Sequence, residues 1–245
     1  MSMLNALIHE SGAEVLKNLR APEFLLPSLI MPVGFFTLFA VAIPGTAQQA
    51  PYMLATFGVF SVMGPAIFGF GASVANERER GWLNLKRAVP APALSYLGAK
   101  VFSTLLFALA ALSLVYIVAG FVAGVELQRS TWATLFAAHL MSAVPFVFLG
   151  LALGFLFSTN GAVAIANILF LLLSALGGLW IPIFVLPKFL QEFAVFLPSF
   201  HLGEIAVSVV QADAPAIPQD HVLATGIMTI LLSLVAFVSW IKQRS

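Results

Sequence analysis

Six long apolar segments constrain what this chain can fold into. Each has the length of about 20 residues that a helix needs to cross a bilayer. Only 9% of the 245 residues are charged, whereas soluble domains have about 25%, and the mean hydropathy is +1.03. We therefore expect an all-α integral membrane protein with six transmembrane helices. The expected spans are Phe24–Ile43, Tyr52–Val74, Val101–Ala123, Thr134–Phe157, Ala162–Ile181 and Val222–Ile241.

Lysine and arginine are distributed unevenly between the two sides of such a bundle. If both termini lie on one side, that side holds nine of the eleven basic residues, and the other side holds only Arg129 and Lys188. Basic residues gather on the cytoplasmic side of membrane proteins. The bias predicts that both termini, and the connection between the second and third spans, are cytoplasmic.

Residues 1–22 precede the first span as a unit of their own, and residues 23–245 form the transmembrane domain. In a helix, Leu4, Ile8 and Leu19 fall near one face, while the charged residues lie elsewhere. We expect a cytoplasmic amphipathic interface helix on the membrane surface, beside a cytoplasmic partner. A plain amphipathic lead-in to the first span is the alternative interpretation.

The stretch "NERERGWLNLKRAVP", residues 76–90, contains six of the 21 acidic and basic residues of the chain. Placing one Arg, Lys or Asp at the centre of a membrane helix costs roughly 2.5–3.5 kcal/mol. The stretch must therefore lie outside the membrane. As a helix it would be amphipathic, with Trp82 and Leu85 on one face and Glu77 and Arg80 on another. It is either a docking helix or a solvated connector.

A proline-rich apolar stretch lies between the fifth and sixth spans. Pro182, Pro187 and Pro198 divide it into pieces that are too short to span. Short apolar pieces of this kind are typical of re-entrant or interfacial helices, so we expect a re-entrant helical hairpin before the sixth span. These prolines and Glu204 could form an exit gate, although an ordinary interfacial position would also explain Glu204.

Two polar residues, His139 and Asn167, fall inside expected spans. Such residues are either functional or form hydrogen bonds between helices. Neither has a second His or a carboxylate near it in the sequence, so the sequence predicts no metal site.

Two separated motifs carry a resemblance to a known family. The sequence "ERERGWLNLKRAVPAP" followed by "YLGAK" resembles the cytoplasmic loop of ABC-2 type transporter permeases. The sequence "GGLWIPIFVLPKFLQEFAVFLPSFHLGE" is similar to the segment after their fifth span. Trp82 departs from the small polar residue that this family has after the glycine. The matching residues of the first motif are Glu77, Arg78, Glu79, Arg80, Gly81, Leu85, Pro90 and Lys100.

The resemblance implies the permease subunit of an exporter in a bacterial plasma (inner) membrane. Two permease subunits, here a homodimer, would pair with two copies of a separate ABC ATPase. The chain has no G-x-x-x-x-G-K-[ST], so ATP and Mg would be bound by that partner, and no cofactor, catalytic residue or nucleic acid is expected here. Membrane lipids are the other expected partner. The implied ATPase-coupling residues are Glu77, Arg78, Glu79, Arg80, Gly81, Trp82 and Leu85.

The apolar spans favour a hydrophobic or amphiphilic cargo, such as a drug, an antimicrobial peptide, a lipid or a glycan precursor. Two alternatives stand beside export. The chain could transmit ATPase motion to an extracytoplasmic maturation or sensing partner without transport. It could also be a membrane enzyme with Ser73 as nucleophile, but the sixth span offers no His to activate that serine.

Overall fold

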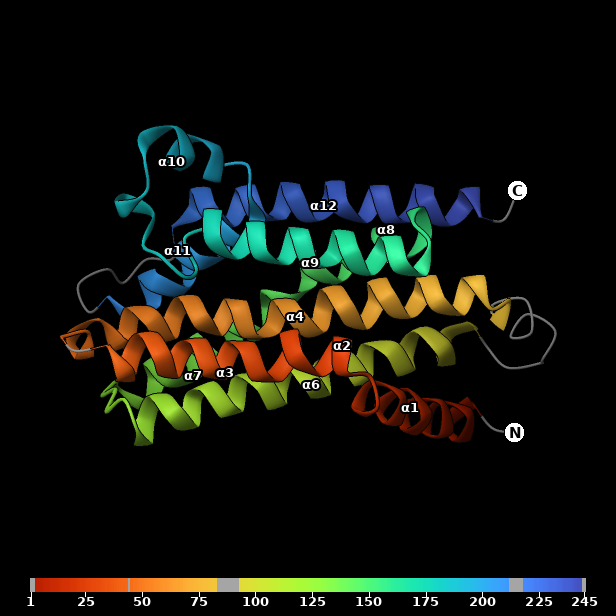
Figure 1. Cartoon of the computed structure of the whole chain (residues 1–245), viewed down its shortest axis with the longest axis horizontal. Coiled ribbons are helices and arrows are strands. Elements are labelled where there is room, and N and C mark those ends of the chain that lie inside the picture. Colours follow the sequence, from red (N-terminus) through yellow and green to blue (C-terminus); the bar gives the residue numbers. More distant parts are fainter. Residues whose placement is uncertain (1–2, 44, 83–92, 212–217, 244–245) are drawn as a thin grey trace.

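The computed structural model describes residues 3–43, 45–82, 93–211 and 218–243, and within these ranges the secondary structure is helical, without strands. A bundle of long helices forms the body, and α1 lies at one end of it (Figure 1). The elements are α1 (Met3–Leu19), α2 (Pro22–Leu25), η1 (Leu26–Ile30), α3 (Met31–Thr37), η2 (Leu38–Ala42), η3 (Ala47–Gln49), α4 (Ala50–Glu79), α6 (Ala93–Phe121), α7 (Arg129–Met141), α8 (Ala143–Leu156), α9 (Thr159–Leu176), η4 (Ile183–Val185), α10 (Lys188–Ala194), α11 (Pro198–Val210) and α12 (Gln219–Lys242).

Helix α4 is the centre of the bundle. It packs against α6, α8, α9 and α11, and 94% of its most apolar 18-residue stretch is buried, compared with 11% for α12. A helix that is apolar on all sides is stable in water only when buried. In a bilayer, lipid can cover such a surface instead, so the contrast identifies α4 as the core helix and α12 as a peripheral one.

Five described helical segments are long and apolar enough to cross a membrane, namely α4, α6, α7 with α8, α9 and α12, and the bent pair α10–α11 would make a sixth. The five coincide with the expected second to sixth spans, which confirms the all-helical, multi-pass prediction. The predicted fifth span, Ala162–Ile181, corresponds to α9, which begins and ends earlier than predicted, at Thr159–Leu176. Gly177 and Gly178 follow it, and the positive φ of Gly178 (77°) turns the chain away from the helix.

The expected first span is a helical run from Pro22 to Ala42 with two π-helical turns, η1 and η2. Its apolar part, Leu26–Ala42, is shorter than the other five helices. Pro27 and Pro32 lie in this run, and each lacks the N–H that a regular α-helix would bond. Widened turns accommodate such breaks in a membrane helix. At 1.5 Å per residue the whole run is about 31 Å long.

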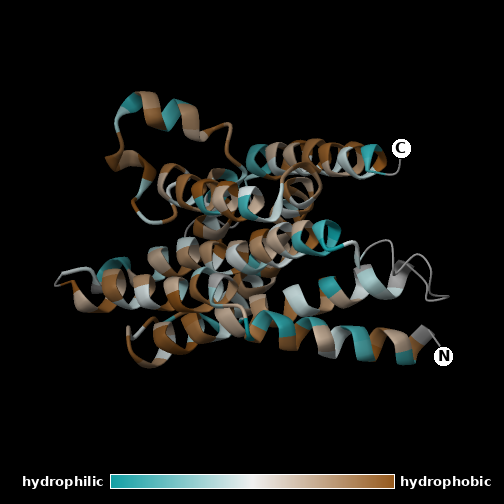
Figure 2. Cartoon of the chain, turned by 45° about the vertical axis from the view of Figure 1, so that its right-hand side comes forward, coloured by the Kyte–Doolittle hydropathy of each residue, from teal (hydrophilic) through white to brown (hydrophobic). Residues whose placement is uncertain are grey.

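The polar residues gather at one end of the bundle. The start of α1, the end of α4, the start of α6 and the end of α12 all lie there (Figure 1). Figure 2 shows hydrophilic residues along α1 and at these helix ends, and hydrophobic residues along the middle of the helices. The prediction that these segments share one side therefore agrees with the fold.

Glycines allow α8 to approach α4 closely. A Cβ on Gly150 would lie 2.8 Å from the carbonyl oxygens of Ala66 and Ile67, and a Cβ on Gly154 would lie 2.8 Å from Cβ of Val74. The G-x-x-x-G pattern of α8 is thus used for packing within the chain. The other G-x-x-x-G pattern of the sequence, Gly120–Gly124, is not used in this way, because a Cβ on Gly120 would meet nothing within 4 Å.

Candidate functional site

Six polar side chains from three helices meet at the polar end of the bundle, and we call them the ion cluster. Each helix contributes two residues, three or four positions apart, so both side chains of a pair lie on the same helix face. Two ammonium groups and two carboxylates give the cluster balanced charge. Its members are Glu14 and Lys17 of α1, Ser73 and Glu77 of α4, and Tyr96 and Lys100 of α6.

Lys100 is the buried centre of the ion cluster, with a side chain that is 0% exposed. Its Nζ donates to Oε1 of Glu14 at 2.9 Å and to Oε1 of Glu77 at 3.1 Å, and also to Oγ of Ser73. An ammonium group has three N–H donors, so every donor has an acceptor. A buried charge is tolerated only when it is paired and hydrogen-bonded in this way.

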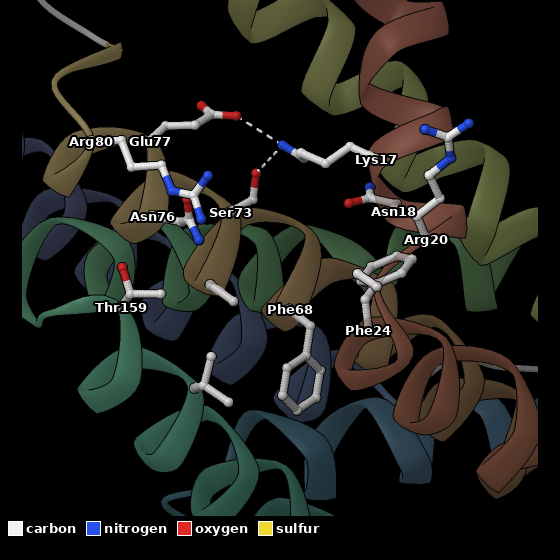
Figure 3. Close-up of a pocket in the computed structure, with 13 residues that line it drawn as sticks. Lys17, Asn18, Arg20, Phe24, Phe68, Ser73, Asn76, Glu77, Arg80 and Thr159 are labelled. Atoms are coloured by element: carbon white, nitrogen blue, oxygen red, sulfur yellow. Dashed lines mark hydrogen bonds and ion pairs between the residues drawn. The ribbon is translucent and has the colours of Figure 1, made fainter.

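Lys17 connects the same groups from the rim of the ion cluster. Its Nζ lies 2.6 and 2.7 Å from the two carboxylate oxygens of Glu14, 2.8 Å from Oε1 of Glu77 and 2.7 Å from Oγ of Ser73. Figure 3 shows its bonds to Glu77 and Ser73. Tyr96 donates its hydroxyl to the other oxygen of Glu77. The cluster therefore ties α1 to both α4 and α6.

The Ser73 hydroxyl is fully used within the ion cluster. It accepts from Lys17 and Lys100 and donates to Oε1 of Glu14 at 3.1 Å. A hydroxyl has one donor and two acceptor positions. Ser73 thus acts as a structural bridge between the charges in this conformation, which gives no support to a nucleophilic role.

Helix α1 turns its polar face inward and its apolar face outward. Glu14 and Asn18 are buried against the bundle, and Asn18 donates to Oγ of Ser103 on α6 at 3.1 Å. By contrast, Leu4 and Ile8 are 64% and 58% exposed. The ion cluster therefore binds α1 to the protein and leaves an apolar stripe exposed on the outward face of the helix.

Opposite charges control the ionisation of the α1 residues. Burial alone would raise the pKa of Glu14, but the ammonium groups of Lys100 and Lys17 outweigh burial and hold that pKa below its ordinary value. Burial would lower the pKa of Lys17, but Glu77 and Glu14 outweigh it and raise that pKa. Both groups are therefore charged near neutral pH.

The lowered pKa of Glu14 predicts how stability depends on pH. Because the folded-state pKa lies below the ordinary 4.5, the stabilisation from ionised Glu14 is complete above about pH 4.5. It is lost as the pH falls through the folded-state pKa. Thermal unfolding of wild type and Glu14→Gln between pH 7 and 3 should show a constant gap that closes only below about pH 4.5. A gap that closes between pH 7 and 5 would contradict the assignment.

The charged stretch does not form the single helix that we expected over residues 76–90. Residues 76–79 are the last turn of α4, and Arg80 caps it by donating its N–H to the carbonyl of Asn76. Gly81 then takes a left-handed conformation with φ 71°, which glycine adopts without a Cβ penalty and which commonly ends helices. The prediction of one continuous amphipathic helix over this stretch is therefore wrong.

Two neighbours in the last turn of α4 bind other helices of the same chain. The guanidinium of Arg78 donates to the carbonyls of Phe155 and Phe157, the second at 2.6 Å, and so satisfies free carbonyls at the end of α8. Glu79 accepts a hydrogen bond from the Thr159 hydroxyl at the start of α9. The end of α4 is thus held by α1, α6, α8 and α9.

A family model described as ABC-2 type transporter matches residues 11–210 of this chain. The chain belongs to the ABC-2 type transporter family. The match covers most of the chain, begins within α1 and ends with α11, so it includes every residue of the ion cluster. As a family member, the chain is a membrane-spanning transporter subunit and not itself an enzyme.

The ABC-2 chain is also similar to a curated protein. It is 30% identical over 233 residues to "Putative transport permease YvfS" of Bacillus subtilis (strain 168). The alignment covers 94% of this chain and 95% of that protein. The similarity therefore extends over nearly the whole transporter subunit.

The remaining residues expected to couple the ABC-2 chain to an ATPase lie beside the ion cluster. Arg80 is exposed, and Trp82 is 51% exposed. Trp82 lines a cavity of about 410 Å³ together with Glu10 of α1 and Tyr96 of α6. Leu85 lies outside the described residues. Coupling by these residues stays a prediction.

The two polar residues within the spans have different surroundings. His139 is fully buried, with Nε2 2.8 Å from the carbonyl oxygen of Ala55 and Nδ1 3.0 Å from the hydroxyl of Tyr116. It joins α7 to α4 and α6 by hydrogen bonds. Asn167 is exposed on α9 and donates to the carbonyl of Val163 in its own helix at 2.8 Å.

The residues of the expected exit gate lie at the opposite end from the ion cluster. Pro182 and Pro187 precede η4 and α10, and Pro198 begins α11. Helices α10 and α11 are bent by 91° with respect to each other. Glu204 is half-buried on α11. Three aromatic side chains in and beside α10 are strongly exposed, namely Phe184, Phe189 and Phe196.

Proposed function

We propose that this chain is the permease subunit of an exporter that moves a hydrophobic or amphiphilic compound out of the cytoplasm or the inner leaflet. ATP would be hydrolysed by a separate ABC ATPase, with two copies of each subunit in a bacterial plasma membrane. The basic bias of one side supports cytoplasmic termini. With the run from Pro22 to Ala42 as first span, the chain has six spans, and α10–α11 is a re-entrant hairpin.

The ion cluster is the observation that carries this proposal. Glu77 lies four residues before Gly81, where the chain leaves α4 for the segment 83–92. A force on that segment would therefore reach α1 through Lys17, α6 through Lys100, and α8 and α9 through Arg78 and Glu79. An ATPase that pulls on the segment would move helices as connected bodies, as coupling requires.

The exposed face of α9 supports pairing of two permease subunits. Asn160, Ala164, Asn167 and Leu171 follow one another at spacings of four, three and four, and all are exposed. Exposed amides within the membrane are costly unless they are bonded or face water. A homodimer with α9 at its centre would cover this stripe, and it would place the two subunits around a shared cargo path.

Two variants test ATPase coupling. In a pull-down with the tagged chain from its native membrane, Glu79→Lys and Trp82→Ala should each reduce the co-purified ABC ATPase at least about fivefold, because charge and aromatic contacts dominate such interfaces. Glu126→Lys, a matched charge reversal at an exposed position at the other end of the bundle, should leave it unchanged.

Thr159→Val separates a docking role of Glu79 from its contact with α9. This change removes the hydroxyl that donates to Glu79 but keeps the charge of the carboxylate. Wild-type ATPase recovery is expected for Thr159→Val. If Thr159→Val loses the ATPase as Glu79→Lys does, or if both coupling variants retain it, the docking assignment is wrong.

Transport distinguishes export from mechanotransmission. In vesicles that contain the chain and its co-purified ATPase, ATP should drive accumulation of an amphiphilic cargo. ATP hydrolysis that is stimulated by an extracytoplasmic partner, without accumulation of any compound, would support transmission to that partner instead.

A further inference from the structure

A cavity of about 300 Å³ opens next to the ion cluster. It lies on α4, between the junction of α1 and α2 on one side and the start of α9 on the other (Figure 3). Its volume is at the lower end of the roughly 300–1,000 Å³ that is usual for small-molecule sites. It therefore has room for a headgroup and a few methylene groups.

The cavity lining is divided into an apolar and a basic part. Phe24 of α2 and Phe68 of α4 lie together below the polar groups, and Ala72 and Val163 also line the cavity. Arg20 and Arg80 lie on opposite sides of the rim (Figure 3). A ligand that fits both parts must have an apolar portion and a group that binds guanidinium.

The positive charges of Arg20 and Arg80, the basic part of the lining, are not paired within the described structure. Among the described residues, neither Arg20 nor Arg80 has an ion pair or a side-chain hydrogen bond. Glu77, the carboxylate within the described lining, already accepts from Lys17 and Lys100. The ten residues after Trp82 contain no Asp or Glu that could neutralise the arginines.

The N-terminal end of α9 also borders the cavity. Thr159, the first residue of this 18-residue helix, lines the cavity. The N-terminal end of a helix carries a partial positive charge and unbonded N–H groups, which favour anions. Glu79 already accepts a hydrogen bond from Thr159 at this helix end, so among the described residues the unpaired positive charge at the cavity is that of the two arginines.

We propose that this cavity binds the anionic headgroup of an amphiphile that enters from the cytoplasmic leaflet. A phosphate or similar group lies between Arg20 and Arg80, which can donate to it in pairs, and the adjoining chain lies on Phe24 and Phe68. A choline headgroup is disfavoured, because its cation would lie near the guanidinium groups. That this amphiphile is the cargo rests on the proposed export function, whereas its binding does not.

Native mass spectrometry of the purified chain tests the binding. Titration with dioleoyl phosphatidylglycerol should give more lipid adduct than dioleoyl phosphatidylcholine, which has the same chains. Arg20→Gln with Arg80→Gln should reduce this preference at least about tenfold, because each lost contact is charge-assisted. Arg129→Gln, an exposed arginine at the other end of the bundle, should keep it. Ala72→Leu, which puts a larger side chain into the cavity lining, should also reduce it.

Three outcomes would overturn the inference: equal adducts with both lipids, a preference retained by the double arginine variant, or inorganic phosphate that displaces the lipid at equal concentration. The last would identify a soluble anion as the ligand. The measurement uses the chain without any ATPase, so its failure leaves the coupling test with Glu79 and Trp82 unaffected. Conversely, failed ATPase coupling with retained lipid selectivity would remove the proposed function but leave the site.

Discussion

Lys100→Met is expected to lower the thermal unfolding midpoint of the detergent-purified chain by roughly 6–20 °C. The change removes a fully buried ammonium that bonds Glu14, Glu77 and Ser73. The two carboxylates of the ion cluster then have Lys17 as their one counter-charge within the cluster. Breaking a buried ion pair by removing one partner costs about 3–5 kcal/mol. For a chain of this size each kcal/mol shifts the midpoint by roughly 2–4 °C.

A second substitution distinguishes charge imbalance from lost packing. Lys100→Met together with Glu14→Gln restores charge balance, so it should recover part of the lost stability, while Lys188→Met at an exposed position should have no effect. If Lys100→Met unfolds at the wild-type temperature, or if the double variant is worse than the sum of the single ones, the ion cluster is not the buried electrostatic unit described above.

Gly150→Ala should lower the unfolding midpoint by several degrees. The new Cβ would lie 2.8 Å from two backbone carbonyl oxygens of α4, and backbone atoms in the core helix cannot move aside as a side chain can. Overpacking of this kind costs roughly 1–3 kcal/mol, against a gain of about 1 kcal/mol that alanine brings to a helix, so we expect a net loss of up to about 2 kcal/mol. The same thermal unfolding assay measures it.

Gly120→Ala is the matched control, because it changes the other G-x-x-x-G pattern at an exposed glycine with no atom within 4 Å of the new Cβ. It should be neutral or slightly stabilising. A Gly150→Ala chain as stable as Gly120→Ala would show that α8 does not approach α4 so closely.

The sequence predicted the helical fold well, because helices that cross a bilayer must be long and apolar. Hydropathy could not predict which of these helices is central. Tyr52–Val74 and Val222–Ile241 are both apolar enough to span, yet the first corresponds to buried α4 and the second to peripheral α12. Lipid and protein interior are equally apolar, so hydropathy does not distinguish them. The mark of burial is in small residues, since Tyr52–Val74 has four glycines and Val222–Ile241 has one.

The candidate site was predicted only in part. Glu77, Arg78 and Glu79 were selected as outward contacts for an ATPase, but their observed partners lie within the chain. Their spacing alone cannot reveal partners such as Lys100, because these come from helices distant in sequence. The four-residue spacing of Ser73 and Glu77, matched by that of Tyr96 and Lys100, could have indicated two polar helix faces that meet.

The separation of the cluster partners along the chain has a consequence for biosynthesis. Glu14 and Lys100 are 86 positions apart, and Ser73 and Glu77 lie between them. When the ribosome has made only the first two spans, the carboxylates of α1 and α4 still lack the buried cation that joins them. Because α1 packs chiefly against α6, we expect it to reach its final position only after the third span has entered the bilayer.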